Sequence, residues 1–247
     1  AKPIHAINFF NSKRKDSNIF SKAQSSNKYD VVMEMFFKSE KEFRIYLNKL
    51  LNEQKGKIFD YLIFNPYYSK IWALKFLQGK KEEGVPFITE TEPIKLDAKD
   101  IKILKMLAED GREKIVEIAD YLKISPELAL YKIKKLHERK IILSSAIIFD
   151  MKKLNYFLST ILINIQNLSK ENEEKIKNFA ESSEHIRSIV LSTSKPNCFI
   201  QLFHKEHSDF IKTINELKSL FKNDFMDLEV LFVEYPEKEN INVLPFL

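Results

Sequence analysis

The sequence predicts an α+β protein in which a mainly helical middle segment separates two copies of a mixed unit of strands and helices. Residues 29–66 and 197–236 share the pattern strand, helix, strand, and phenylalanines stand at matching places, Phe43 and Phe210. The segment between the copies, residues 94–152, has a different pattern of three short amphipathic helices followed by a strand. A repeat that flanks an unrelated segment indicates a duplicated domain with another domain between its copies.

The second copy, assigned to residues 153–247 with the C-terminal tail, contains a complete set of elements. They alternate as strand, helix, strand, strand, helix and strand over residues 156–166, 169–183, 186–192, 198–204, 208–221 and 225–235. This βαββαβ order is that of the ferredoxin-like split unit.

The first strand of this copy predicts how the sheet packs. Ile161, Ile163 and Ile165 should point to one face of the sheet, and Leu158 and Leu162 to the other. Two helices can cover only one face, so the other face must meet another apolar surface. A second copy of the same sheet is the simplest candidate, which predicts sheet-to-sheet pairing within one chain or self-association into a homodimer or larger assembly.

The first copy, residues 1–66, is a degenerate ferredoxin-like domain. About ten residues separate its opening strand from the strand near Ile19, which is too few for a full helix. We expect residues 2–10 to supply the central strand. An alternative is that residues 6–15, which resemble 145–154, descend from the end of a lost second copy of the middle segment.

A connector over residues 67–93 joins the first copy to the middle segment. Its composition predicts a short helix that begins at Pro66 and ends near Gly79, with Trp72 on the apolar side. Residues 84–93 should then form an extended linker.

The middle segment has the signals of a winged helix-turn-helix. Asp97 is a good N-cap for a first helix that ends before Gly111, and a short second helix follows over about 114–122. Ser125 caps a third helix that has proline at its first position. Residues 141–150 are extended and can form the wing. Three helices, a short turn between the last two and then a strand define this fold.

The third helix, residues 125–139, is rich in cations on one side. Leu130, Ile133 and Leu136 are spaced to face the core. Cations that flank a helix in the major groove would contact phosphates, and the first turn would meet base edges. The predicted partner is double-stranded DNA, and the predicted contact residues are Ser125, Glu127, Leu128, Tyr131, Lys132, Lys134, Lys135, Arg139 and Lys140.

Two motifs in the middle segment resemble those of a known family. The opening matches "LDxxDxxILxxLxxDGR" and the third helix matches "ISPxxxxxxIKxLxxxxII". Both resemble the helix-turn-helix of the leucine-responsive/asparagine-regulator (Lrp/AsnC) family of transcription regulators. The resemblance covers about 94–236 well and 19–66 faintly. It implies DNA binding through the third helix and wing, and regulatory domains that pair sheet to sheet and often bind an amino acid.

The sequence departs from this family at two places. The family usually has glycine where Lys140 stands, and a Gly-Asp turn where Ser194–Asn197 and Ser25–Lys28 stand. That turn helps to form the family's effector pocket, so we expect weak amino-acid binding. If an amino-acid-like effector does bind, the predicted site is Ser192, Thr193, Ser194 and Asn197.

Two other functions are alternatives to a transcription regulator. Relatives of this architecture are known as sirohaem decarboxylases, and His185, His204 and His207 are the candidate tetrapyrrole ligands here. The chain could also be an assembly protein that has lost DNA binding. We favour a regulator without enzymatic activity, because the enzyme alternative leaves the basic third helix unexplained.

No metal site or cofactor is expected. Cys198, His204 and His207 lie close in sequence, but without a fourth ligand or paired spacing they indicate a buried thiol and two histidines at a strand-to-helix junction. Phosphate-binding glycine loops and nucleophile motifs are lacking.

Composition agrees with a soluble protein. The 247 residues carry a formal charge of +5 and one cysteine, which suits a reducing cytoplasm. The sequence shows no signal peptide or apolar run long enough for a membrane span. The lysine, isoleucine and asparagine usage is typical of an AT-rich genome, and we expect an archaeal source.

Overall fold

The computed structural model describes residues 9, 11, 16–25, 27–72, 75, 84–88, 94–145, 149–221 and 224–234. The elements are, in chain order, β1 (Ile19–Ser25), β2 (Val31–Met35), α2 (Glu40–Glu53), β3 (Pro66–Ile71), β4 (Val85–Ile88), α4 (Ala98–Glu109), α5 (Ile115–Leu122), α6 (Pro126–Glu138), η1 (Lys152–Leu154), β5 (Phe157–Ile165), α7 (Lys170–Ser182), β6 (Ile186–Ser192), β7 (Cys198–His204), α8 (His207–Phe221) and β8 (Phe225–Glu234). None of the helices in these residues is long and apolar enough to cross a membrane.

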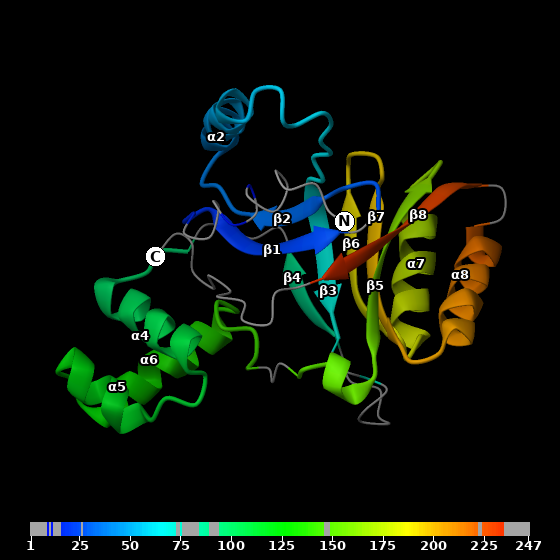
Figure 1. Cartoon of the computed structure of the whole chain (residues 1–247). Coiled ribbons are helices and arrows are strands. Elements are labelled where there is room, and N and C mark those ends of the chain that lie inside the picture. Colours follow the sequence, from blue (N-terminus) through cyan, green and yellow to red (C-terminus); the bar gives the residue numbers. More distant parts are fainter. Residues whose placement is uncertain are drawn as a thin grey trace.

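The strands form one antiparallel sheet with the order β2-β1-β8-β5-β7-β6-β3-β4. The second copy of the repeat supplies β5, α7, β6, β7, α8 and β8, in the order expected from its sequence. We call these six elements the second unit, and β1, β2 and α2 the first unit. Helices α7 and α8 lie side by side on one face of the sheet (Figure 1).

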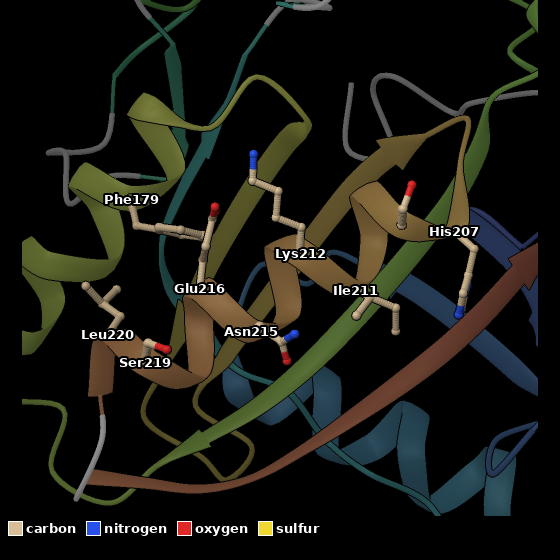
Figure 2. Close-up of a pocket in the computed structure, with 9 residues that line it drawn as sticks. Phe179, His207, Ile211, Lys212, Asn215, Glu216, Ser219 and Leu220 are labelled. Carbon is tan, nitrogen blue, oxygen red and sulfur yellow. The ribbon is translucent and has the colours of Figure 1, made fainter.

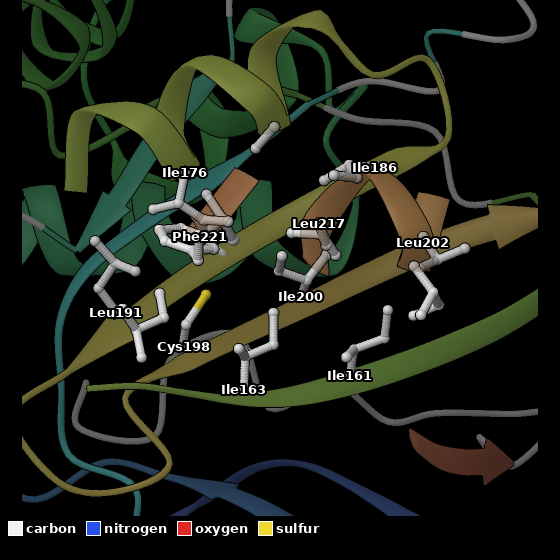
Figure 3. Packing of buried hydrophobic residues seen from close by; sticks show 14 of the residues in the cluster. Ile161, Ile163, Ile176, Ile186, Leu191, Cys198, Ile200, Leu202, Leu217 and Phe221 are labelled. Atoms are coloured by element: carbon white, nitrogen blue, oxygen red, sulfur yellow. The ribbon is translucent and has the colours of Figure 1, made fainter. Parts of the chain in front are cut away.

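The main core lies between that face and the two helices. Ile161 and Ile163 of β5 point toward Ile176 of α7 and toward Leu217 and Phe221 of α8 (Figure 3). The side chains of Ile161, Ile163 and Ile165 are fully buried, as their alternation predicts. Burial of each such isoleucine stabilises the fold by roughly 2 kcal/mol.

The opposite face of the sheet is also buried. Leu162 and Phe203 on this face are only 6% and 5% exposed. The reason is that β8 leaves the main sheet at its far end and pairs with β1, through Gln24 with Glu234 and Ser25 with Val233. The first unit thereby continues the sheet and lies across the open face of the second unit (Figure 1).

The connector after the first unit differs from the prediction. Pro66 begins strand β3, which pairs along the free edge of β6, instead of a helix. Proline is tolerated there because the first residue of a strand need not donate to the ladder. Part of the expected extended linker is β4, which pairs with β3. Lys75 is helical, whereas the rest of 73–83 lies outside the described residues.

Trp72 directly after β3 is buried in the main core, with 1% of its surface exposed. A Cβ atom at Gly84 would lie 2.5 Å from Trp72 Nε1, so only glycine allows the chain to pass the indole there.

The central strand expected from residues 2–10 lies almost entirely outside the described part of the chain. Phe9 is helical, and the other residues of that stretch lie outside the described part of the chain. Residues 57–65 are the counterpart of β8 in the first copy, and they contain no strand. Phe59 in this stretch is 90% exposed. Within the described residues β2 is therefore the edge strand at this end of the sheet.

Candidate nucleic-acid interface

The middle segment folds into three helices around its own core. Ile103 of α4, Ile118 and Leu122 of α5, and Ala129 and Leu136 of α6 are buried together. The expected inward stripe of α6 is off by one position at its start, because Ala129 is buried and Leu130 is exposed. Ala129 allows α5 to approach α6 closely, which a leucine would prevent.

The turn between α5 and α6 is built from local signals. Lys123 ends α5 in the left-handed conformation, with φ of 53°. Ser125 Oγ then accepts a hydrogen bond from the backbone N–H of Leu128 at 3.3 Å, as expected of its N-cap position. The cap and the proline after it fix where α6 begins, and therefore which side chains stand at its leading end.

The expected wing is not a strand in the described residues. Residues 141–145 and 149–150 contain no strand, and 146–148 lie outside the described part. Ile141 and Ile142 instead fold back against the helical core, and both of their backbone N–H groups donate to Leu136 O. Once used for the helix end, these groups are unavailable to a strand ladder.

Lys132, one of the predicted DNA contacts, forms ion pairs inside the helical domain. Its Nζ lies 2.5 Å from Asp97 Oδ2 and 2.9 Å from Asp100 Oδ1, and its side chain is 16% exposed. The hydrogen bond from Lys132, followed by that from the backbone N–H of Asp100, lowers the pKa of Asp97. Lys132 therefore ties α6 to the first turn of α4, and its charge is neutralised inside the domain.

The other predicted cations remain on the surface of α6 and just after it. Lys134, Lys135, Arg139 and Lys140 are exposed. Lys135 Nζ lies 3.3 Å from Glu138 Oε2 and 5.7 Å from the centre of the Tyr131 ring. Arg139 Nη2 donates to Lys95 O at 3.0 Å. Exposed contacts of this kind are weak enough to be exchanged for phosphate oxygens.

The leading end of α6 presents a different kind of surface. Leu128 and Tyr131 are 40% and 56% exposed and lie near one another on successive turns. Glu127 is exposed beside them, and hydrogen bonds from its own backbone N–H and from Ser125 lower its pKa. Apolar, aromatic and carboxylate groups can contact a thymine methyl, a base edge or a cytosine amino group.

Sequence reasoning missed the surface of α5. Val116 is 56% exposed, and Tyr121 is exposed near Lys102 Nζ, which lies 5.9 Å from its ring centre. The only signal for Tyr121 in the sequence is that it lies outside the inward stripe of the helix.

Comparison with known proteins identifies the segment. Residues 96–137 match the model of the AsnC-type helix-turn-helix domain. The HTH-type transcriptional regulator LrpA of Pyrococcus abyssi is 32% identical over 122 residues, which are 49% of this chain and 84% of that protein. The chain belongs to the Lrp/AsnC family.

A second relative shows how much of this chain corresponds to a whole Lrp/AsnC-like protein. The uncharacterized HTH-type transcriptional regulator PH0061 of Pyrococcus horikoshii is 28% identical over 148 residues, 60% of this chain and 98% of that protein. Its crystal structure has a TM-score of 0.52 with 26% identity over the same shares of both chains. A nearly whole relative therefore corresponds to only three fifths of this Lrp/AsnC chain. These relatives are named as regulators, and they lend no support to the decarboxylase alternative.

The position that is usually glycine in the family has the expected backbone here. Lys140 has φ of 55°, in the left-handed region that favours glycine. Its backbone N–H donates to His137 O at 2.9 Å and closes the end of α6. In this Lrp/AsnC chain the left-handed residue that ends α6 is therefore a lysine, whose backbone is strained.

The predicted effector residues are engaged in holding a turn. Ser192 Oγ donates to Asn65 O at 2.8 Å and also lies 2.7 Å from Ser194 Oγ. The side-chain amide of buried Asn197 accepts from Ile165 N at 2.9 Å and donates to Ile165 O at 2.8 Å. Thr193 is exposed. These contacts give Ser192 and Asn197 structural roles in this Lrp/AsnC sheet.

The histidines do not assemble a metal site within the described residues. His204 Nε2 lies 2.9 Å from Ser159 Oγ, and burial together with the charges of His185 and His207 lowers the pKa of His204. Burial raises the pKa of Cys198, which keeps the thiol protonated in the core. Cys198 is buried, as expected from its sequence.

Proposed function

We propose that this protein is a DNA-binding transcription regulator in which α6 enters the major groove. The observation that carries the proposal is an AsnC-type helix-turn-helix at residues 96–137 whose α6 and the residues just after it present exposed cations, with apolar and aromatic groups at the start of the helix. Relatives over 84% and 98% of their own length are named as transcription regulators.

The residues of α6 divide into two classes. Lys134, Lys135, Arg139 and Lys140 contact phosphates, because long cations on the flanks of a groove-bound helix meet the backbone. They set affinity and its salt dependence. Lys132 is left out of this class because two carboxylates already bind it.

Glu127, Leu128 and Tyr131 form the second class and contact base edges, with Ser125 fixing their position as the helix cap. An ionised carboxylate at this end favours cytosine amino groups and disfavours close phosphates. This division predicts that sequence preference resides in the first two turns of α6.

The proposed assembly follows from the two units. The first unit acts as a shortened ferredoxin-like regulatory domain that covers the open sheet face of the second, so one chain forms an internal pseudo-dimer. Residues 94–152 form the DNA-binding domain and 153–247 the complete regulatory domain, whereas β3 and β4 of the connector 67–93 belong to the sheet. Homodimers of such chains would place two copies of α6 on one duplex.

The test measures duplex binding by fluorescence anisotropy across a salt series, on sites selected from genomic DNA and on scrambled sites. Lys135→Ala should weaken all duplexes alike and reduce the salt slope by about one unit. Tyr131→Ala should change which sequence is preferred and leave non-specific binding nearly intact. Lys170→Ala, an exposed lysine at the start of α7, is the matched control.

Melting curves of each variant provide the folding control. If Lys135→Ala and Tyr131→Ala both bind like the parent while the fold holds, α6 is only a basic surface helix. The chain would then be an assembly protein that has lost DNA binding.

A further inference from the structure

A cavity of about 2880 Å³ lies between the two units. Its described lining comes from β1, β2 and α2 on one side and from the open face of the second unit on the other, together with residues 57–66 and 149–160. We propose that this inter-unit cavity binds a largely apolar molecule that carries an uncharged hydrogen-bonding group and is larger than an amino acid. The inference goes beyond DNA binding and does not depend on it.

The floor of the inter-unit cavity contains a row of uncharged polar residues. Thr160 of β5 is paired with Gln201 of β7, which is paired with Ser188 of β6. Paired residues of neighbouring antiparallel strands share a face, and all three line the cavity. Ser188 Oγ donates to Gln201 Oε1 at 3.0 Å.

Thr160 is the residue of this row that points to a ligand. It is 1% exposed, and its Oγ1 has no hydrogen-bond partner. Ile161, the next residue, belongs to the core under α7 and α8, so Thr160 faces the cavity. A buried hydroxyl without a partner is unfavourable in a folded protein, because it has lost its hydrogen bonds with water. A bound molecule that offers an oxygen or nitrogen to this hydroxyl would supply the missing hydrogen bond.

The walls of the inter-unit cavity favour a ligand that is mainly apolar. On the floor, the polar row is flanked by Phe199 and Phe203 of β7. Phe20 and Phe36 of the first unit line the cavity and pack edge to face, with ring centres 5.4 Å apart. Aromatic side chains around a few placed polar groups are typical of sites for small organic ligands.

The size of the cavity and the uncharged polar row argue against an amino acid bound at Thr160. Binding sites for drug-sized ligands have volumes of roughly 300–1,000 Å³, so this cavity admits a considerably larger molecule. Charged side chains such as Glu34, Asp150 and Arg187 stand elsewhere in the lining, but the polar row itself contains no ionisable side chain that could pair with an α-ammonium or α-carboxylate group placed at Thr160. Burial of an unpaired charge would oppose binding.

A shallower groove on α8 is the competing candidate. Its lining includes Phe179, His207, Ile211 and Leu220, with a volume of about 1020 Å³. Figure 2 shows these side chains spread along the outer side of α8 and the neighbouring end of α7. None of its described polar atoms is a buried group that lacks a partner. It therefore serves as the control surface for the test.

The test uses Nile red, an uncharged dye with a large apolar body and one carbonyl oxygen, added to the full chain. Its fluorescence rises on entering an apolar site and shifts to the blue when its carbonyl loses a hydrogen bond. We expect saturable binding. Val190→Trp, which fills the cavity from β6, should remove the saturable signal, and Ile211→Trp in the α8 groove should leave it unchanged.

Thr160→Val is nearly isosteric and tests the polar row without blocking the cavity. It should weaken Nile red binding by about three- to tenfold, as expected for one lost hydrogen bond, and shift the bound emission to the blue. The ligand-free variant should melt at a higher temperature, since an unpaired buried hydroxyl is gone.

Three results would overturn the proposal. The first is absence of saturable Nile red binding by the parent protein. The second is loss of binding in Ile211→Trp but not in Val190→Trp, which would place the dye on α8. The third is a Thr160→Val variant whose affinity, emission and melting temperature all equal those of the parent.

Discussion

Lys132 on α6 donates a hydrogen bond to the Asp100 carboxylate on α4 at 2.9 Å. Asp100 is buried, and its other oxygen accepts from the backbone N–H of Asp97 at 3.1 Å, which closes the capping box of α4. Helix α6 is thus fastened to the first turn of α4 by a charged contact, and the charge of Lys132 is used inside the domain.

The first prediction follows for Lys132→Met. The variant should lose roughly 1–3 kcal/mol of unfolding free energy, because Asp100 is left buried without its charged partner. Its binding to duplex DNA should be unchanged once the folded fraction is accounted for, whereas Lys134→Ala should weaken binding. Thermal melts and anisotropy titrations on both variants measure the stability and the affinity for duplex DNA. A folded Lys132→Met variant that loses affinity for DNA through the loss of its charge alone would contradict the prediction.

The same contact predicts a pH dependence. The pKa of Asp97 is lowered in the folded state, first by the hydrogen bond from Lys132. A carboxylate with a depressed folded pKa stabilises the protein above its unfolded pKa of about 4, and this stabilisation is lost as the pH falls through the folded value. The stability difference between parent and Lys132→Met should therefore shrink below about pH 4. A difference that stays constant down to acid unfolding would contradict this.

Lys140→Gly is predicted to stabilise the protein. The left-handed backbone of Lys140 costs a lysine about 1 kcal/mol, and glycine removes that strain. The extra freedom of glycine in the unfolded chain offsets part of the gain, so the net effect should be about 0.5 kcal/mol. Lys140→Ala keeps the strain and removes the charge, so both variants should weaken DNA binding equally while only the glycine variant melts higher.

Local signals in the sequence were sufficient to predict where the helices α4 and α6 begin. Ser125 as cap of α6 and Asp97 with Asp100 in the capping box are determined by residues within three positions of each other. The inward stripe was misplaced by one position because Leu130 is more apolar than Ala129. Only the close approach of α5 to α6 decides that the smaller residue is buried.

The sheet outside the second unit could not be predicted from local pattern. Pro66 followed by aromatic residues fits a helix start or an edge strand, and the choice depends on the free edge of β6, over a hundred residues away. Lys132 was assigned to DNA because its cation is visible in the sequence, whereas its two carboxylate partners are 32 and 35 residues distant. Such long-range partners are set by the fold and not by spacing.

Lys75 gives a prediction in alkaline solution. Its Nζ donates to Ala180 O at 2.6 Å and lies 4.6 Å from the centre of the Trp72 ring. Burial lowers the pKa of Lys75 to about 8, with Glu181 opposing the shift. The unfolded chain then binds more protons between about pH 8 and 10.5, so stability rises with pH across this window. Lys75→Met should lack the rise, which melting curves of both proteins from pH 7 to 10 would measure.

We expect amino acids to bind only weakly at the turn of residues 192–197. Ser192 and Asn197 already use their polar side chains in hydrogen bonds to Asn65 and Ile165. An amino acid would have to replace these internal contacts. In a thermal-shift screen of the twenty amino acids, none should raise the melting temperature substantially, and a large shift from any one would reject this interpretation.

Adjacent residues of β5 give the last prediction, because they face opposite sides of the sheet. Ile161 is fully buried in the core under α7 and α8, whereas Leu162 is 6% exposed and lines the inter-unit cavity. Ile161→Glu places an unpaired carboxylate in the dry core and should cost several kcal/mol, enough to unfold the second unit. Leu162→Glu should cost less, about 1–2 kcal/mol, because the flexible glutamate side chain can carry its carboxylate away from the sheet into the open part of the cavity.

The two variants should also differ in shape. Leu162→Glu weakens the packing of the first unit on the sheet, so it should keep the fold of the second unit while the chain becomes more extended or changes its assembly state. Light scattering coupled to gel filtration, with limited proteolysis of the first unit, would detect this change. Equal behaviour of both variants in melting and in assembly would mean that the first unit does not pack on this face, and the internal pseudo-dimer would be wrong.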